Sequence, residues 1–234
     1  MEVEFMKRLT IIAVVMLVLL AAVLPSYAAS FDDHKATAYM NIKFECGCTR
    51  TGTGAMIGRR GLITCAHNLI CFQHSKWLKS CTFIFGAKSA NSGQKKVTSG
   101  YTYTVYDTFE NGYSGENDIG YVIFEQPIGD STGWYAWQVG SDEFLNEEFT
   151  HVNYYTYNGR FNELFTIQYV SNSKQLKLDD NPGDGDGAPV YLAYEGLDWP
   201  TVVGVFTTGG NGKGYARRLT NQVADDMRVA GAFN

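Results

Sequence analysis

Two polar residues stand where a β-rich chain could carry out acid–base chemistry. His67 ends the run Gly61-Leu-Ile-Thr-Cys-Ala-His67, in which an apolar strand leads directly into the imidazole. Asp118 begins the run Asp118-Ile-Gly-Tyr-Val-Ile-Phe124, so its carboxylate precedes a second apolar strand. Such a carboxylate can turn inward and hold a histidine in one tautomer, which prepares the imidazole to accept a proton. Spacing alone favours plainer roles, namely a structural histidine and a turn aspartate.

The loop Asn181-Pro-Gly-Asp-Gly-Asp-Gly-Ala-Pro-Val190 is the third candidate, because its glycines predict a tight, shaped turn. Such a loop could cradle an anion, or it could carry a nucleophile together with its oxyanion hole. It could also form a calcium site, although the spacing fits no twelve-residue EF-hand loop and the terminal Glu is absent. The carboxylates of that calcium alternative are Asp179, Asp180, Asp184 and Asp186.

Five motifs together resemble the chymotrypsin-like serine peptidases, and most closely the bacterial glutamyl endopeptidases. They are Thr53-Gly-Ala-Met-Ile-Gly, Leu62-Ile-Thr-Cys-Ala-His67, Asn117-Asp-Ile-Gly-Tyr-Val-Ile, Pro127-Ile-Gly-Asp-Ser-Thr-Gly-Trp134 and Gly187-Ala-Pro-Val190. The order histidine, aspartate, nucleophile loop agrees with this family. The resemblance implies two β-barrels with a site in the cleft between them. It also implies that His67 is the general base and that Asp118 orients it.

The resemblance calls for a serine before Gly187, and the sequence does not supply one. Asp186 takes the nucleophile position, and Asp184, Gly185 and Asp186 form the expected oxyanion loop. A carboxylate there forms an anhydride at best, places negative charge where an oxyanion must be stabilised, and favours a protonated His67. The sequence therefore predicts a pseudo-peptidase that binds a peptide or protein in the cleft. Two alternatives are an active serine-type endopeptidase that uses another group or register, and a non-catalytic structural or surface protein.

Substrate preference also departs from the subgroup. Glutamyl endopeptidases read an acidic substrate residue with a histidine in a Val-Gly-Ile-His strand, and Phe206 stands in that place here. We expect the edge formed by Phe206, Thr207, Thr208 and Gly209 to bind an extended peptide by strand addition. A core role for Phe206 is the alternative.

Short strand-like runs separated by turns must position these residues, and Tyr101-Thr-Tyr-Thr-Val105 alternates as a half-buried antiparallel strand does. The first series is expected at 38–44, 61–65, 81–85, 101–106 and 119–124, and the second at 149–157, 164–170, 176–178, 190–194, 202–206 and 214–217. The predicted fold is all-β, with two packed six-stranded antiparallel β-barrels and a short C-terminal helix. A single large β-sandwich is the alternative. The predicted helix is capped by Thr220 or Asn221 and carries Val223, Met227 and Ala230 on one face.

The predicted divisions of the chain follow from this series of strands. They are a secretory signal peptide at 1–29, a first barrel at 30–125, a connector at 126–133, a second barrel at 134–219 and the helix at 220–234. The signal peptide rests on Lys7-Arg8, the apolar run from Leu9 to Leu24 and the small residues after Pro25. A retained membrane anchor is its alternative, but the run is short for a span.

Composition narrows the partners and the metal chemistry. The net charge of -5 argues against nucleic acid, and we expect a secreted monomer that does not bind membranes after signal cleavage. Export permits disulfides between the five cysteines, which are Cys46, Cys48, Cys65, Cys71 and Cys81. Because their number is odd, at least one stays unpaired. A zinc site is disfavoured because Cys46-Gly-Cys48 lacks the usual two-residue gap and no Cys-x-x-Cys follows. The sequence therefore predicts neither a metal nor a cofactor.

Overall fold

The computed structural model describes residues 33–87, 93, 95–105, 114–145, 149–156, 159–168, 174–181, 183, 185–193, 199–210 and 213–234. The chain divides into the units Met1–Phe31 and Asp32–Asn234, and every element below belongs to the second unit. The predicted signal peptide lies outside the described residues. None of the helices in the described ranges has the length and apolar character needed to cross a bilayer.

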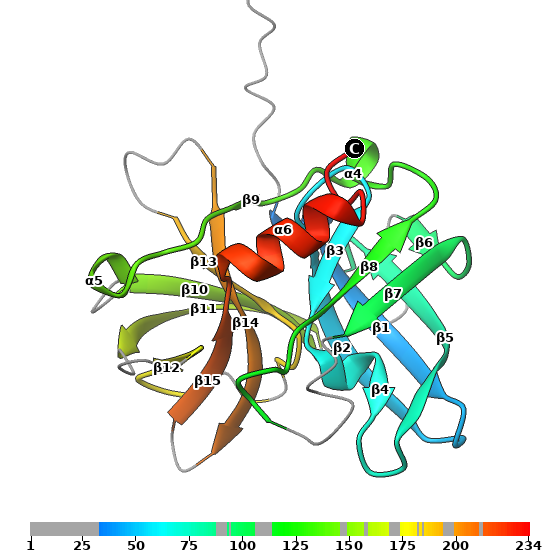
Figure 1. Ribbon diagram of the computed structural model, residues 1–234, viewed down its shortest axis with the longest axis horizontal. Helices are drawn as coiled ribbons and strands as arrows, with labels where there is room; N and C mark the ends of the chain where they lie inside the picture. The colour runs from blue at the N-terminus through cyan, green and yellow to red at the C-terminus, as the bar shows by residue number, and fades with distance from the viewer. Residues whose placement is uncertain are drawn as a thin grey trace, which may run out of the picture. The chain divides into compact units, whose positions relative to one another are not determined.

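The first sheet contains eight strands in the order β4-β5-β1-β2-β3-β8-β7, with β6 paired to β5 (Figure 1). Their bounds are β1 Thr37–Phe44, β2 Thr49–Met56, β3 Gly61–Thr64, β4 Ile70–Cys71, β5 Lys76–Phe85, β6 Lys95–Val97, β7 Tyr101–Val105 and β8 Gly120–Phe124. All the pairings among these strands are antiparallel. Strands that are not neighbours in this order also make contact, since Phe83 of β5 packs edge-on against Tyr101 of β7 with ring centroids 5.1 Å apart.

The second sheet closes on itself. It has the order β13-β10-β11-β12-β15-β14-β9, and a further pairing of β13 with β14 makes a ring of β13, β10, β11, β12, β15 and β14. The bounds are β9 Ala136–Trp137, β10 Phe149–Thr156, β11 Gly159–Gln168, β12 Gln175–Leu178, β13 Pro189–Leu192, β14 Thr201–Gly210 and β15 Lys213–Arg218. Apolar side chains such as Val152, Ile167 and Phe206 fill the ring. Only β9, which joins β14 in parallel, lies outside it.

The helices are short, and most of them lie in connections. They are α2 Asp33–Ala36, the 3₁₀ turn η1 Ala66–Asn68, α4 Gly129–Thr132, α5 Asp142–Leu145 and α6 Asn221–Val229. Thr220 caps α6 by accepting a hydrogen bond from the Val223 amide, and Val223 and Met227 are buried as predicted. Ala230 does not extend this face, because the helix ends at Val229 and Ala230 is exposed.

Buried polar contacts join the two sheets. The Asn153 side chain of β10 donates to both Thr37 of β1 and the Tyr135 hydroxyl, at 3.0 Å each, and the two hydroxyls lie 2.8 Å apart. A buried amide that lost these partners would be costly to desolvate, so the network fixes how the sheets face each other. After α6, the chain returns to the first sheet, where Ala232 accepts a hydrogen bond from the Arg60 amide.

The predicted all-β fold with two sheets and a C-terminal helix is confirmed. The six-stranded count fits the closed second ring, whereas the first sheet has two additional short strands, β4 and β6. The sequence prediction missed β2, because Thr49-Arg-Thr-Gly-Thr-Gly carries few apolar residues. The boundaries predicted for the two barrels and for the connector stay predictions.

Candidate functional site

Antiparallel pairing of β3 with β8 places His67 beside Asp118. The last residue of β3, Thr64, pairs with the first residue of β8, Gly120, so the end of one strand adjoins the start of the other. His67 follows β3 in the turn η1, and Asp118 precedes β8. Residues far apart in the chain therefore share one strand end, where functional side chains often lie.

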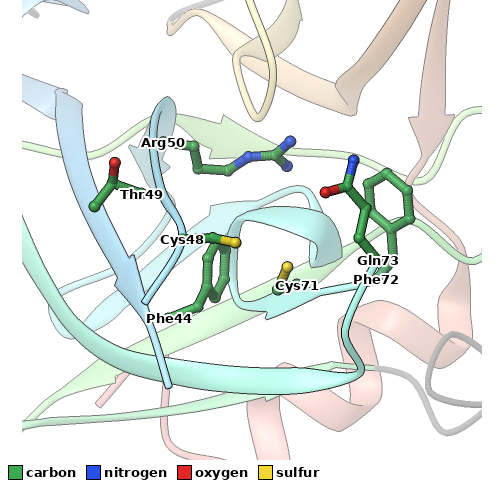
Figure 2. A pocket seen from close by; sticks show the side chains of 7 residues that line it. All are labelled: Phe44, Cys48, Thr49, Arg50, Cys71, Phe72 and Gln73. Atoms are coloured by element: carbon green, nitrogen blue, oxygen red, sulfur yellow. The ribbon is translucent and has the colours of Figure 1, made fainter. Parts of the chain in front are cut away.

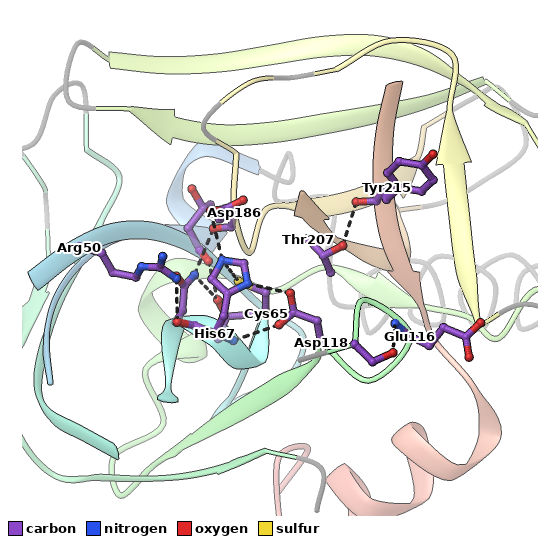
Figure 3. A network of polar contacts seen from close by, with 12 residues as sticks. Arg50, Cys65, His67, Glu116, Asp118, Asp186, Thr207 and Tyr215 are labelled. Atoms are coloured by element: carbon purple, nitrogen blue, oxygen red, sulfur yellow. Dashed lines mark hydrogen bonds and ion pairs between the residues drawn. The ribbon is translucent and has the colours of Figure 1, made fainter. Parts of the chain in front are cut away.

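Asp118 holds both the backbone and the ring of His67 (Figure 3). Its Oδ1 accepts a hydrogen bond from the His67 amide at 3.0 Å, and its Oδ2 lies 2.7 Å from Nδ1 of the imidazole. The Asp118 side chain is fully buried. A carboxylate on Nδ1 fixes the ring orientation and directs Nε2 toward whatever lies opposite.

Asp186 lies opposite. Its Oδ2 is 3.1 Å from Nε2 of His67, and Figure 3 shows the imidazole between the two carboxylates. The Asp186 carbonyl accepts hydrogen bonds from the Thr53 amide at 2.8 Å and from Asn68 Nδ2 at 3.1 Å. The first sheet thus fixes the backbone of a residue that belongs to the second. The Asp186 side chain thus reaches the place where a nucleophile would meet the base.

Gly187 explains the shape of this turn. Its φ is +87°, and a Cβ there would lie 2.1 Å from the Thr53 carbonyl oxygen and 2.3 Å from Thr64 Oγ1. Only glycine fits, because any side chain would combine an unfavourable backbone conformation with a collision against backbone. Close approach of the loop to β2 is what brings Asp186 to His67.

The two carboxylates change the charge of the imidazole. Burial by itself lowers the pKa of His67, but negative charge from Cys65 and Asp118 and hydrogen bonds to Asp118 and Asp186 hold this pKa well above its usual 6.5. Only the thiolate form of Cys65 contributes charge, and burial raises the pKa of that thiol to about 11. Asp118 and Asp186 both favour the protonated ring, and a protonated ring cannot accept a proton from a nucleophile.

Cys65 is the second group near Nε2, with its Sγ at 3.3 Å. Its side chain is fully buried, and its pKa of about 11 keeps it a neutral thiol. A nucleophilic cysteine needs a thiolate that substrate can reach. Cys65 therefore lacks both the ionisation and the access that a nucleophile needs.

The remaining oxyanion-loop residues are placed only in part. Asp184 lies outside the described residues, whereas Gly185 is buried and its carbonyl accepts a hydrogen bond from the Ala188 amide at 2.8 Å. The calcium alternative gains no support among the described carboxylates. Asp179 accepts a hydrogen bond from the Thr166 amide, and Asp186 faces His67, so these two oxygens serve different partners.

The residues expected to bind substrate differ in accessibility. Phe206 is fully buried in the core of the second sheet, which favours its core role. Thr207 is also buried and donates to the Tyr215 carbonyl at 3.1 Å, whereas Thr208 is partly exposed. Pairing of β13 with β14 ends at Val205, so within the described residues the segment from Thr207 through Gly209 has a strand partner on the β15 side only.

Sequence reasoning missed two residues that support the site. Asn68 bridges Thr64 Oγ1 and the Asp186 carbonyl through its Nδ2. Arg50 donates from Nη1 to the His67 carbonyl at 2.9 Å. Asn68 directly follows the histidine and could have been considered, but Arg50 belongs to β2, which the sequence pattern did not reveal.

Comparison with solved structures identifies the architecture. A Glu endopeptidase has a TM-score of 0.69 at 14% identity, over 90% of this chain and 95% of that one. The protease Anisep from Arthrobacter nicotinovorans gives 0.69 at 11%, over 85% and 96%. The thermostable serine protease AL20 from an extremophilic microorganism gives 0.72 at 9%, over 86% and 99%.

These neighbours are chymotrypsin-like serine proteases, and the predicted chymotrypsin-like fold is thereby confirmed. At identities this low, the likeness establishes the fold alone. No protein-family model matches the chain, and no curated protein matches it by sequence.

Proposed function

We propose that this protein is a secreted pseudo-peptidase that binds a peptide or protein segment in the cleft beside His67 without hydrolysing it. The observation that carries the proposal is the 3.1 Å contact between Asp186 Oδ2 and His67 Nε2. A serine peptidase needs a hydroxyl there and a neutral imidazole to deprotonate it. Here a carboxylate occupies the position and favours the protonated imidazole.

The segment Thr207–Gly209 supports peptide binding. Among the described residues, the edge of this segment that faces away from β15 pairs with no strand. The segment also lies close to Asp186, because the carbonyl of the preceding residue, Phe206, accepts a hydrogen bond from the Gly187 amide. An extended peptide can add to such an edge through main-chain hydrogen bonds. Export is proposed from the sequence pattern of residues 1–29, in which Lys7-Arg8 precede an apolar run and small residues.

The second candidate is an active endopeptidase, which the 2.7 Å His67–Asp118 contact favours. Incubation of the purified protein with casein and a peptide library tests both. We expect no cleavage beyond that of a His67→Ala control. Cleavage that disappears in this control would establish the active endopeptidase and refute the pseudo-peptidase.

Binding is tested separately by hydrogen exchange. Library peptides that bind should slow exchange of the Thr207–Gly209 amides, while amides in β1 keep their rates. A serine-directed phosphonate should leave the protein unlabelled. Labelled protein would reveal a nucleophile, and bound peptides that protect other strands instead would remove this edge as the binding site.

A further inference from the structure

Four potential metal ligands gather on the first sheet, away from the Asp186 loop. The Sγ atoms of Cys46, Cys48 and Cys71 and a ring nitrogen of His74 all lie within 4.8 Å of one another. The Nδ1 atom of His74 is 3.5 Å from the sulfur of Cys48 and 3.5 Å from that of Cys71. Figure 2 shows the sulfurs of Cys48 and Cys71 directed into the same space.

Two neighbouring hairpin turns supply these ligands. The turn between β1 and β2 carries Cys46 and Cys48. Cys71 is the last residue of β4, and His74 follows it by three positions in the turn that leads to β5. Pairing of β1 with β5 brings the turns together, and the Glu45 amide donates to the Trp77 carbonyl at 3.0 Å.

Both turns use uncommon backbone conformations. Gly47, between the first two cysteines, has φ +88°, and Ser75, directly after His74, has φ 49°. Ser75 is the only residue other than glycine with positive φ in the part of the chain that the structure describes. Such a conformation is unfavourable for a serine and concentrates at ligand sites, where surrounding contacts stabilise it.

We propose that Cys46, Cys48, Cys71 and His74 bind one Zn²⁺ ion as a closed, structural Cys₃His site. Thiolate and imidazole are ligands that zinc prefers, and structural zinc is tetrahedral with four protein ligands. With Zn–S near 2.3 Å and Zn–N near 2.0–2.1 Å, a tetrahedron places sulfur and nitrogen about 3.6 Å apart. The two sulfur–nitrogen distances of 3.5 Å agree with that edge.

A disulfide is the competing fate of these thiols, because oxidation would remove two of the three sulfurs as ligands. The five cysteines are free in the structure. A disulfide would also give His74 no role, whereas its Nδ1 lies equally close to Cys48 and Cys71. The geometry of the histidine is what favours the metal.

Zinc here would connect the two turns next to the segment that holds His67. The adjoining pocket is lined by residues of both turns: Phe44, Cys48, Thr49, Arg50, Cys71, Phe72 and Gln73. Arg50 links the two regions, because its Nη1 donates to the His67 carbonyl. With all four positions taken by protein ligands, the ion keeps no site for water and acts as a structural element.

Metal analysis of the purified protein tests the proposal. We expect about one zinc ion per chain. The variants Cys48→Ser, Cys71→Ser and His74→Ala should lose it. Cys81→Ala is the matched control, because Cys81 is buried in β5 outside the cluster, and this variant should keep its zinc.

Cobalt titration of metal-free wild-type protein gives an answer that does not depend on how the variants fold. Tetrahedral thiolate coordination should produce intense visible absorption that saturates at one equivalent and disappears when zinc is added. Freshly isolated protein that contains no zinc and has a disulfide between two of the three cysteines would overturn the proposal. Cobalt spectra without thiolate bands would overturn it as well.

Discussion

The first sheet contains two histidines on one short stretch, and their neighbours give them different chemistry. His67 is 4% exposed and lies between the carboxylates of Asp118 and Asp186, which favour its protonated form. His74 is exposed and has two sulfur atoms 3.5 Å from Nδ1, which is the arrangement of a ring that shares a metal ion with thiolates. A cationic imidazole offers no lone pair, whereas a zinc ligand requires one. Neighbouring groups therefore set the function of each ring.

Asp186→Ser should break this contrast most strongly. It supplies a hydroxyl at the position 3.1 Å from Nε2 and removes one of the charges that keep His67 protonated. We expect peptide hydrolysis to rise by about 10²-fold or more over wild type, since base-assisted nucleophiles contribute at least that much. Initial rates with a fluorogenic peptide library measure it.

Asp186→Ala is the matched control, because it removes the carboxylate without adding a nucleophile. It should stay as inactive as wild type. Equal activity of the Ser and Ala variants would show that the new hydroxyl does not react, and two inactive variants would show that the cleft has diverged beyond this residue.

Removal of zinc should destabilise the protein through the site that contains His74. A chelator that strips the ion is expected to lower the midpoint of thermal unfolding by about 10 °C, because ligand binding to the folded state contributes several kcal/mol. Calorimetry measures the shift. His74→Ala should be insensitive to the chelator, and Cys81→Ala should respond as wild type does. An unchanged wild-type midpoint would contradict a structural ion.

Gly187 lies in the loop that carries Asp186, and Gly47 lies in the turn that carries Cys46 and Cys48. Replacing each glycine measures how tightly the backbone is packed at that site. Gly187→Ala combines φ +87° with a Cβ 2.1 Å from the Thr53 oxygen, so we expect a loss of about 3 kcal/mol or more in the free energy of unfolding. Gly47→Ala has φ +88° and no atom within 4 Å, so only the conformational cost of about 1 kcal/mol applies. Urea unfolding measures both. Equal losses would mean that the loop carrying Asp186 is not held against β2.

The pH dependence should show the charge of His67. Because its pKa is higher in the folded chain than the unfolded value near 6.5, the stabilisation is complete below about pH 6.5 and is lost as pH rises through the folded pKa. Each unit of raised pKa corresponds to about 1.4 kcal/mol. Asp186→Asn should lower the pKa of His67, so that the stabilisation is lost at a lower pH than in wild type.

Unfolding curves across the pH range, together with NMR titration of the His67 ring, measure this effect. Asp180→Asn is the control, since Asp180 is exposed and its Oδ1 accepts from the Asn181 amide rather than from His67. A His67 pKa that is the same in wild type and Asp186→Asn would show that Asp186 does not hold the imidazolium.

Much of the first site follows from local sequence. Apolar runs that end at His67 and begin at Asp118 define strand ends, and Gly187-Ala-Pro-Val190 defines the turn before β13. The absence of a serine from that turn is also a fact of sequence. The exposed Ala230, the polar strand β2 and the core position of Phe206 were harder to predict, because helix ends and strand pairing depend on tertiary contacts.

The metal cluster shows the limit of local patterns. Cys46-Gly-Cys48 lacks the usual two-residue gap and no Cys-x-x-Cys follows, so the sequence argued against a metal. Only the pairing of β1 with β5 brings the two turns together, so that the three sulfurs and the His74 nitrogen lie within 4.8 Å of one another.

The sequence by itself determined the all-β character of this protein, the order of its candidate residues and the lack of any serine between Asn181 and Val190. These depend on residue type and short-range periodicity, which the chain carries at every position. Only the tertiary structure decided that Asp186 reaches Nε2 of His67, that Cys65 is too buried to react and that three cysteines surround His74. Contacts of this kind depend on strand register between distant segments, and neither residue type nor local spacing encodes it.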